Sequence, residues 1–427
     1  MFLSNNNLKN KCLYLRRIIK VRVRYMDELN PYFILLLLSG MVIASYMFNL
    51  IAVFLKIPSV ILLLSTGIFF QFLFGDEFSA TRETNLLLEL LGIIGLILIV
   101  LEGALDLKLS KEKIPVISRS LLSSGGVLIV TSSVIAAILN YFLQMSAEEA
   151  IIYSVPLGVV SSAIAIPSVA ELPNAKREFI IYESTFSDIL GIMLFNYLVA
   201  GNPLSAGSAG HFFMGLFLII LISSVSSLLL LFMLNYTTAH VKFFLIFSIL
   251  ITIYSVSKFF HLPSLLLILV FGLMINNTEI VIKGKLKKYL NPEKLKDVLK
   301  ELKLITAESA FIIRTFFFIL FGFTINLQSL LNYDVILIGS LIIATILIIR
   351  FILLKFISGD NIFPEMLIAP RGLITIVLFY SIPDELRSDR FNDGILFYVI
   401  IVSAVIMMLG LMLSKREFTT DIEKISH

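Results

Sequence analysis

The chain has 427 residues, of which 58% are hydrophobic and 15% charged, and its formal net charge is +4. Soluble globular domains carry about 25% charged residues, so this composition excludes a soluble domain and predicts an all-α polytopic membrane protein. Membrane-spanning helices would occupy nearly the whole length, which leaves no room for an ATP-hydrolysing domain; we expect no enzymatic activity, no cofactor and no nucleic-acid partner.

The first 25 residues are basic. They hold seven lysines and arginines and no acid, and no apolar run of the kind found in a signal peptide follows them before Met26. We expect translation to start at Met26, which would also remove Cys12, the only cysteine of the chain. The alternative is a genuine cytoplasmic arm, which would require an even number of membrane spans.

Apolar runs bounded by proline, glycine, asparagine and charged residues predict about 13 membrane-spanning helices. In chain order these runs are 32–54, 58–74, 85–106, 117–142, 149–170, 178–200, 211–234, 241–259, 262–276, 305–325, 334–357, 364–382 and 394–414.

Lysines and arginines in the loops set the predicted orientation, because cytoplasmic loops carry an excess of both. The loop 277–303 holds eight lysines and is therefore predicted to be cytoplasmic. Alternation then places the N-terminus outside and the C-terminus inside. The same loop resembles an amphipathic segment that contacts anionic lipid or senses pH, although its charge can equally reflect topology alone. Three other basic segments fall on the cytoplasmic side, namely Lys108 to Lys113, Lys176 with Arg177, and Lys415 with Arg416.

The fifth span is interrupted. Pro156, Gly158, Ser161, Ser162 and Pro167 break its apolar pattern. Interrupted helices in transporters use their exposed backbone ends to bind ions and substrates. The alternative is an ordinary proline kink, which is common in membrane helices.

The sixth span contains ESTFSD, residues 183–188, and thus two carboxylates in an apolar run. A charge at the bilayer centre costs about 2.5–3.5 kcal/mol on insertion scales, so intramembrane acids usually mark functional sites. Glu183 and Asp188 lie about 140° apart on a helix, whereas Asp188 shares a face with Ser184 and Glu183 with Ser187. One carboxylate can be neutralised by an arginine while the other binds a cation or a proton. Alternatively, arginines neutralise both, and the acids only stabilise the bundle.

Further ionisable residues lie within the predicted spans, and acids and arginines at membrane depth usually pair. Glu102 and Glu308 lie near span ends, where a structural role in contact with water is favoured. The pattern assigns no specific role to Arg314. These residues are Glu102, Glu308, Arg314, Arg350 and Arg371.

The twelfth span is also interrupted, because APRGL places Pro370, Arg371 and Gly372 in its middle. The two interrupted spans are seven positions apart in span order. An odd separation reverses the direction of the second copy, so spans four to six and eleven to thirteen are predicted to be inverted repeats with two broken, crossing helices.

In this order, the motifs resemble those of the monovalent cation:proton antiporters, the sodium/hydrogen exchanger superfamily. The resemblance covers about residues 30–414. It is carried by ESTFSD, by Arg350, by APRGL and by IIRTFFF at residues 312–318.

The resemblance implies a role for each polar residue of these motifs. Asp188 would alternately bind the proton and the transported cation, and Glu183 would form a structural ion pair with Arg350. Arg371 would lie where the broken helices cross, together with Pro167, Pro370 and Gly372. Hydroxyl groups would ligate the ion or shape its site; they belong to Ser161, Ser162, Ser184 and Ser187.

The implied activity is secondary active antiport of a monovalent cation, Na⁺ first, for H⁺. With Asp188 as the only exchangeable carboxylate, one cation for one proton is the simplest stoichiometry, and the exchange would be electroneutral. The chain departs from the family at Ser187, where many electroneutral members have Asn and electrogenic members Asp, and at SSAIAIPS in the fifth span, which is nearer the potassium-linked branch. The alternatives are K⁺/H⁺ antiport and transport of another solute on the same fold.

The resemblance also implies partners and a setting. The partners are Na⁺, K⁺ or Li⁺, H⁺, membrane lipid and a second copy of the chain in a homodimer. The setting is a cell membrane, the inner or plasma membrane of a prokaryote, where exchange would serve pH homeostasis. The expected parts are a basic segment (1–25), scaffold and dimerisation helices (26–106), a first core repeat (117–200), linker and scaffold helices (211–325), a second core repeat (334–414) and a short cytoplasmic tail (415–427).

Overall fold

The computed structural model describes residues 31–55, 58–74, 82–199, 206–236, 242–259, 264–281, 292–325, 327–359 and 362–425. Across these ranges the regular structure is entirely helical, which confirms the predicted fold class. The basic segment 1–25 and the expected start at Met26 lie outside the described residues.

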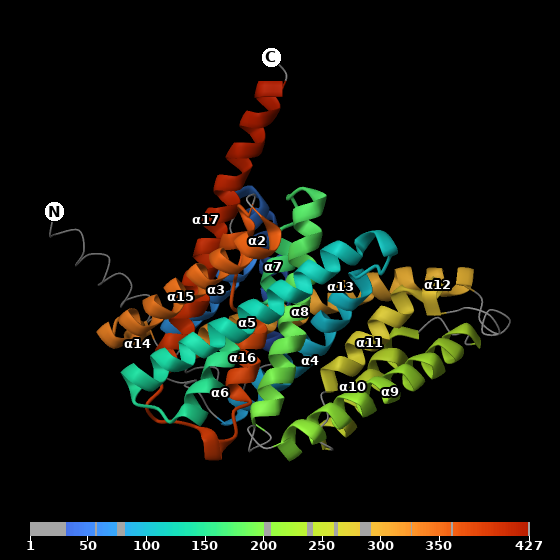
Figure 1. Ribbon diagram of the computed structural model, residues 1–427, viewed down its shortest axis with the longest axis horizontal. Helices are drawn as coiled ribbons and strands as arrows, with labels where there is room; N and C mark the ends of the chain where they lie inside the picture. Colours follow the sequence, from blue (N-terminus) through green and yellow to red (C-terminus); the bar gives the residue numbers. More distant parts are fainter. Residues whose placement is uncertain are drawn as a thin grey trace. The chain divides into compact units, whose positions relative to one another are not determined.

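The α-helices follow the predicted spans closely in most of the chain (Figure 1). They are α2 (Pro31–Leu55), α3 (Ser59–Phe74), α4 (Arg82–Asp106), α5 (Ile114–Leu143), α6 (Ala147–Gly158), α7 (Ser162–Ser168), α8 (Asn174–Val199), α9 (Ala206–Tyr236), α10 (Lys242–Phe259), α11 (Ser264–Asn276), α12 (Thr278–Val281), α13 (Pro292–Thr324), α14 (Leu327–Leu330), α15 (Tyr333–Ser358), α16 (Leu373–Tyr380) and α17 (Asp393–Ile425).

Two helices extend beyond the predicted spans. α13 begins at Pro292, inside the loop 277–303, because proline is favoured at the first helical position and the Glu, Lys and Leu residues that follow are strong helix formers. α17 continues to Ile425, so the predicted tail is helical over most of its length.

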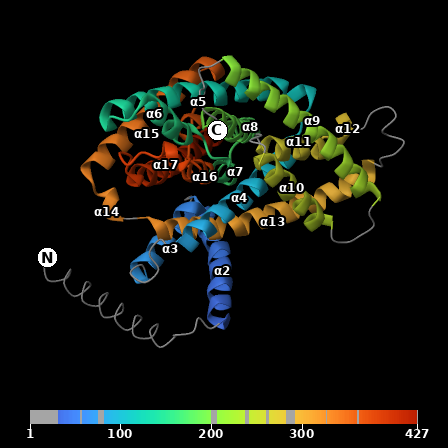
Figure 2. The ribbon, with the colours of Figure 1, turned by 90° about the horizontal axis from the view of Figure 1, so that it is seen from below.

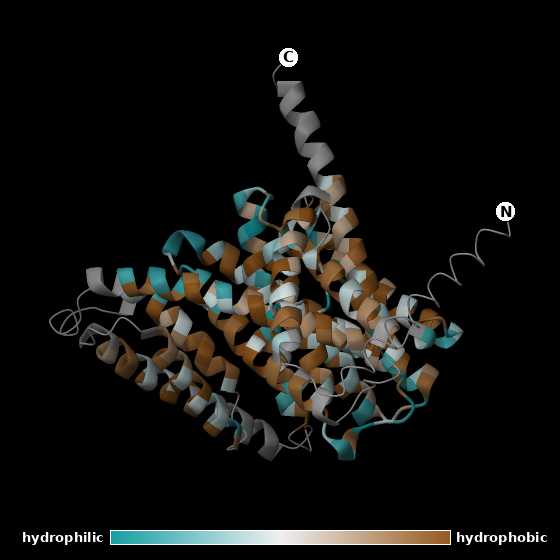
Figure 3. Cartoon of the chain, turned by 180° about the vertical axis from the view of Figure 1, so that it is seen from behind, coloured by the Kyte–Doolittle hydropathy of each residue, from teal (hydrophilic) through white to brown (hydrophobic). Residues whose placement is uncertain are grey.

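Six of the described helical segments are long and apolar enough to cross a membrane. Hydrophobic residues cover most of the length of the helices, and hydrophilic residues gather near their ends (Figure 3). Shorter apolar helices occur as well, so the number of 13 spans stays a prediction. The six segments are Leu35–Ala52, Lys111–Leu143, Ala147–Ser168, Asp297–Thr324, Tyr333–Ser358 and Asp393–Ser414.

The chain divides into two compact units. Among the described residues, the first contains α2, α3, the start of α4 up to Leu88, and the end of α13 from Arg314. Ser45 and Thr315 share a buried hydrogen bond of 2.6 Å. Gly67 of α3 lies directly against Gly322 of α13, since a Cβ on Gly67 would come within 2.8 Å of the Gly322 Cα. Small residues at this crossing therefore allow the two backbones to touch.

The second unit comprises residues 89–313 and 326 to the end, and α5 is its central helix. α5 packs against α6, α8 and α15, and α15 packs in turn against α17 (Figures 1 and 2). The buried face of α5 is rich in serine, with Ser120, Ser123 and Ser124 among its members. Small side chains on this face permit the close approach of three neighbouring helices.

Both interrupted spans are broken in this unit. The fifth consists of α6 and α7, separated by the non-helical residues 159–161. The twelfth consists of a 3-10 turn, Glu365–Leu367, a non-helical segment 368–372, and α16. The first part of the twelfth span is thus a single turn rather than a half-helix. Pro167 lies inside α7 rather than in the non-helical segment 159–161. Pro156 and Gly158 come before that segment, in the last turn of α6.

The contact at Gly67 yields a stability prediction. Gly67→Ala should destabilise the protein by about 1–3 kcal/mol, because the added methyl group has no space against α13. Gly40→Ala is the matched control in α2, since no atom lies within 4 Å of a Cβ at that position. It should be neutral or stabilising by about 0.5–1 kcal/mol. Thermal unfolding midpoints in detergent measure both, and equal midpoints for the two variants would contradict the contact.

Candidate functional site

The two non-helical segments cross in the interior of the second unit. The Ser161 N–H donates to the carbonyl of Pro370 at 2.9 Å, which joins the segments directly. The Arg371 N–H donates to the hydroxyl of Ser403 in α17 at 3.0 Å. The backbone of both breaks is therefore held by partners outside its own helix, as buried polar groups require.

Arg371 lies at this crossing and is fully buried. Its Nε donates to the carbonyl of Leu157 at 2.8 Å and its Nη2 to that of Gly158 at 3.0 Å. Its Nη1 donates to the carbonyl of Ala369 at 2.6 Å. The carbonyls of residues 157 and 158 end α6 and have no partner within that helix. The positive side chain of Arg371 thus satisfies the negative end of α6 and links it to the second break.

Asp188 of α8 faces the first break and is 2% exposed. Its Oδ2 accepts from the Ser162 N–H at 3.3 Å and from the Ser162 hydroxyl. Its Oδ1 has no partner among the described residues, and the same holds for the buried hydroxyl of Ser161. A carboxylate with one open oxygen can accept a proton or a cation.

The other two serines of the motif are committed to backbone groups. Ser187 accepts from the Val160 N–H at 2.9 Å, so it supports the break in the fifth span. Ser184 donates to the carbonyl of Ile180 in its own helix at 2.8 Å. Of the four predicted hydroxyls, the structure thus brings that of Ser162 to Asp188. It gives Ser184 and Ser187 other partners, and the Ser161 hydroxyl lies against Gly372 of the second break.

Glu183 and Arg350 form a buried ion pair between α8 and α15. The Nη2 of Arg350 lies 2.6 Å from Glu183 Oε2, its Nη1 lies 3.0 Å from Oε1, and the two side chains are 0% and 1% exposed. Ser123 of α5 also donates to Glu183 Oε1 at 2.6 Å. This bidentate pair neutralises Glu183, so Glu183 has no open oxygen comparable to Asp188 Oδ1.

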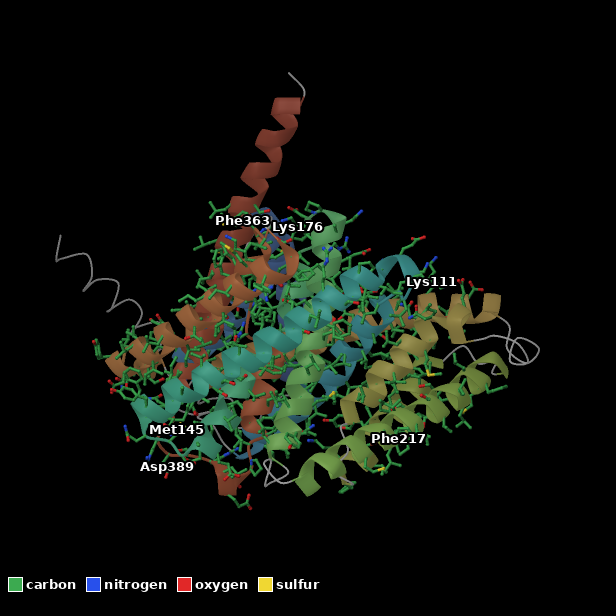
Figure 4. The ribbon with its side chains drawn as sticks, viewed as in Figure 1. Lys111, Met145, Lys176, Phe217, Phe363 and Asp389 are labelled. Carbon is green, nitrogen blue, oxygen red and sulfur yellow. The ribbon has the colours of Figure 1, made fainter. Side chains whose placement is uncertain are left out.

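The pair continues into contacts that the sequence motifs did not indicate. The Nε of Arg350 donates to the backbone carbonyl of Glu365 at 2.9 Å. The Glu365 side chain accepts from Lys176, the second residue after the start of α8, at 2.9 Å, and Lys176 also donates to the carbonyl of Phe363. Lys176 and Phe363 lie side by side at the end of the unit opposite to Met145 and Asp389 (Figure 4). In the sequence, Lys176 indicated only topology, and Glu365 was not among the predicted site residues, although an acid at the start of an interrupted span is a usable signal.

The site offers carboxylate and hydroxyl oxygens and no set of metal ligands. Among the described residues, no group of three or more His, Cys, Asp or Glu side chains could hold a metal ion.

Comparisons with known proteins identify a family and a fold for the chain. The family model described as "Sodium/hydrogen exchanger, transmembrane" matches residues 18–415. The sodium proton antiporter MjNhaP1 from Methanocaldococcus jannaschii, in a structure at pH 8, is similar in fold, with a TM-score of 0.65, 18% identity, and coverage of 90% of this chain and 99% of that one. An electron microscopy structure of the same antiporter gives a TM-score of 0.60 at 18% identity, with 92% and 97% covered. None of the curated protein sequences matches the chain.

The buried ion pair predicts a specific pattern of stability. Arg350→Met should lower stability by about 3–5 kcal/mol, because it leaves the Glu183 charge buried without its partner. Adding Glu183→Gln removes that charge and should recover part of the loss. Thermal unfolding midpoints of the single and double variants measure this coupling; strictly additive losses would show that the two side chains do not stabilise each other.

Two salt bridges at the start of α8 provide a second comparison. Lys176–Glu365 spans 2.9 Å with side chains 14% and 10% exposed, whereas Lys113–Glu178 spans 2.7 Å at 32% and 37%. We expect Lys176→Met to cost about 1–3 kcal/mol, since it leaves a largely buried charge without this hydrogen bond. Lys113→Met should cost about 0.2–1 kcal/mol because water screens the exposed pair.

The charge-swapped double variant Lys176→Glu with Glu365→Lys tests whether the interaction itself is responsible. It should recover part of the stability lost in Lys176→Met. No recovery in the unfolding midpoint, or equal costs for the Lys176 and Lys113 variants, would contradict a specific link between α8 and the second break.

Proposed function

The chain belongs to the transmembrane sodium/hydrogen exchanger family, and we propose that it exchanges Na⁺ for H⁺ by competition of the two ions for Asp188. Cation/proton antiport is the activity of the protein, and the family gives Na⁺ and H⁺ as the transported ions. In a transporter of this kind one binding site faces the two sides of the membrane in turn. If the cation and the proton exclude each other at that site, the movement of one ion down its gradient is coupled to the movement of the other in the opposite direction.

The observation that carries the proposal is the open oxygen of Asp188. One carboxylate oxygen is held by Ser162, while Oδ1 and the Ser161 hydroxyl have no partner among the described residues. Both a proton and a cation can occupy this position, and each excludes the other. An unoccupied, charged Asp188 is costly to move through the membrane, which favours return of the site only when one ion is bound.

The buried pair supports an electroneutral cycle. Glu183 is bound by both terminal nitrogens of Arg350 and by Ser123, so its charge is balanced within the protein. Asp188 is then the single carboxylate that exchanges, so one cation replaces one proton. Such a cycle moves no net charge across the membrane.

Finer features of the activity belong to the same proposal. The repeats 117–200 and 334–414 would move as a transport core against scaffold helices, in a homodimer in the cell membrane of a prokaryote, and would serve pH homeostasis. Support comes from the contacts that join the two breaks, such as Ser161 with Pro370 and Arg371 with Gly158. These contacts connect both repeats at one point, as a common moving body requires.

Exchange in proteoliposomes tests the role of Asp188. Asp188→Asn should abolish the cation-dependent release of a trapped pH gradient, read by a fluorescent pH probe with Na⁺, Li⁺ and K⁺ added in turn. Asp389→Asn makes the same chemical change at an exposed position and should leave exchange intact. Exchange that persists in Asp188→Asn would refute competition at this residue, and K⁺ as the best substrate would favour K⁺/H⁺ antiport.

Membrane voltage tests the stoichiometry. A potential of 100 mV contributes about 2.3 kcal/mol per transported charge, so an electrogenic cycle would change its rate strongly when the voltage is clamped with K⁺ and valinomycin. We expect the rate of Na⁺/H⁺ exchange to be unaffected by the clamped voltage. A rate that follows the imposed voltage would require a second exchangeable charge.

A further inference from the structure

Two adjacent hydroxyl side chains of α5 are buried without a partner. Thr131 is 0% and Ser132 1% exposed, and neither hydroxyl oxygen has a hydrogen-bond partner among the described residues. Buried polar groups in native proteins are nearly always satisfied, by protein or by ordered water. Each open hydroxyl therefore indicates a ligand or a water molecule.

The two hydroxyls depart from the usual behaviour of serine and threonine in membrane helices. A buried serine or threonine in a membrane helix normally bonds to the carbonyl four residues before it. Ser184 and Thr185 of α8 do so, and so does Ser133, the next residue of α5, which donates to the carbonyl of Ile129 at 2.8 Å. Thr131 and Ser132 lack this bond, so their hydroxyls remain available to another group.

Ser132 lies against the break in the fifth span. A Cβ on Gly158 would overlap the Ser132 hydroxyl, so that hydroxyl rests directly on the backbone of the last residue of α6. The carbonyl of Gly158 accepts from Arg371 at 3.0 Å. Ser132 thus lies beside the crossing, on the side formed by α5.

Thr131 lies further along the contact between α5 and α8 than Asp188. α5 and α8 run in the same direction, because Ser120 bonds to the Phe179 carbonyl at 3.1 Å and Ser123 to Glu183 at 2.6 Å. Leu190, two residues after Asp188, packs beside Gly125 of α5, and Thr131 follows Gly125 on that helix. Thr131 also lies within about 20° of Ser120 on the helix, on the face turned to α8.

Asp188 and Ser161 alone give an incomplete oxygen shell. Each offers one open oxygen at the crossing, while the Ser162 hydroxyl donates to Asp188. A cation that leaves bulk water needs oxygen ligands in place of its hydration shell. Neutral hydroxyls can hold water molecules that supply such ligands without adding charge.

We propose that Thr131 and Ser132 form a water-binding subsite on α5, and that the water held there completes the oxygen shell of the monovalent cation at Asp188. The inference rests on the proposed exchange at Asp188 and adds a determinant of cation affinity and choice. Because these two side chains hold the water, they would help to set the size of the cation that fits at Asp188.

Substitutions in α5 test the subsite with a control one residue away. Ser132→Ala and Thr131→Val each remove one hydroxyl at nearly constant volume, and Ser133→Ala removes a hydroxyl from an exposed position. Losing one hydrogen bond in the cation-bound state should raise the apparent KM for Na⁺ by about three- to tenfold. The ratio of the KM values for Li⁺, Na⁺ and K⁺ should change as well, with kcat nearly constant, whereas Ser133→Ala should match the unchanged protein.

Thermal unfolding with and without cation gives a readout independent of transport. Na⁺ should raise the unfolding midpoint of the unchanged protein and of Ser133→Ala, and it should raise that of Ser132→Ala less at the same concentration. A higher midpoint for Ser132→Ala in the absence of cation, with unchanged KM values and cation order, would overturn the subsite. That result is expected of a buried hydroxyl that holds nothing.

The outcomes also separate this inference from the proposed function. Normal exchange in the Ser132 and Thr131 variants, together with loss in Asp188→Asn, rejects the subsite alone. An unchanged protein that neither exchanges cations nor gains stability from them rejects both. If Ser132→Ala does not fold, Ser132→Cys on a Cys12→Ser background keeps the volume; a water-accessible subsite then predicts reaction with a small hydrophilic thiol reagent that is slowed by Na⁺, and no reaction rejects it.

Discussion

The guanidinium of Arg371 satisfies backbone carbonyls at both helix breaks, and the rest of the site depends on it. A chain that leaves helical geometry inside a membrane must find partners for its free carbonyls, because lipid supplies none. Arg371 donates to Leu157, Gly158 and Ala369. With these groups satisfied, the break can stay open next to Asp188 without collapsing into a continuous helix.

The two carboxylates of α8 divide two tasks that one residue cannot perform together. Glu183 is held by Arg350 and Ser123, and the buried pair anchors α8 to α15 and, through Arg350, to the segment before the second break. Asp188 keeps an oxygen free. The paired Glu183 holds the helices together, whereas the proposed exchange requires a carboxylate with an open oxygen, and a separation of about 140° around the helix keeps the two side chains apart.

The serines around Asp188 are chemically identical, but their hydroxyls bond to different groups. Ser184 bonds to its own helix and Ser187 to the Val160 N–H, whereas Ser162 reaches Asp188. Helical spacing alone places Ser184 on the same face of α8 as Asp188. The hydroxyl nevertheless turns to the backbone, because a carbonyl four residues back is the nearest acceptor in a membrane helix.

The sequence by itself determined the helical membrane class, the positions of most helices, both breaks and the residues that carry charge into the membrane, because these are local properties of composition and apolar periodicity. Only the tertiary structure decided the partners. By charge alone any of the three arginines in the predicted spans could neutralise Glu183, and only the family resemblance favoured Arg350. In the structure Arg350, 167 residues away, is the partner, while Arg371 reaches back 214 residues to Leu157. Local sequence pattern also did not indicate the salt bridge between Lys176 and Glu365 or the unpaired hydroxyls of Thr131 and Ser132. Such contacts depend on how α5, α8 and α15 pack, which no short stretch of sequence specifies.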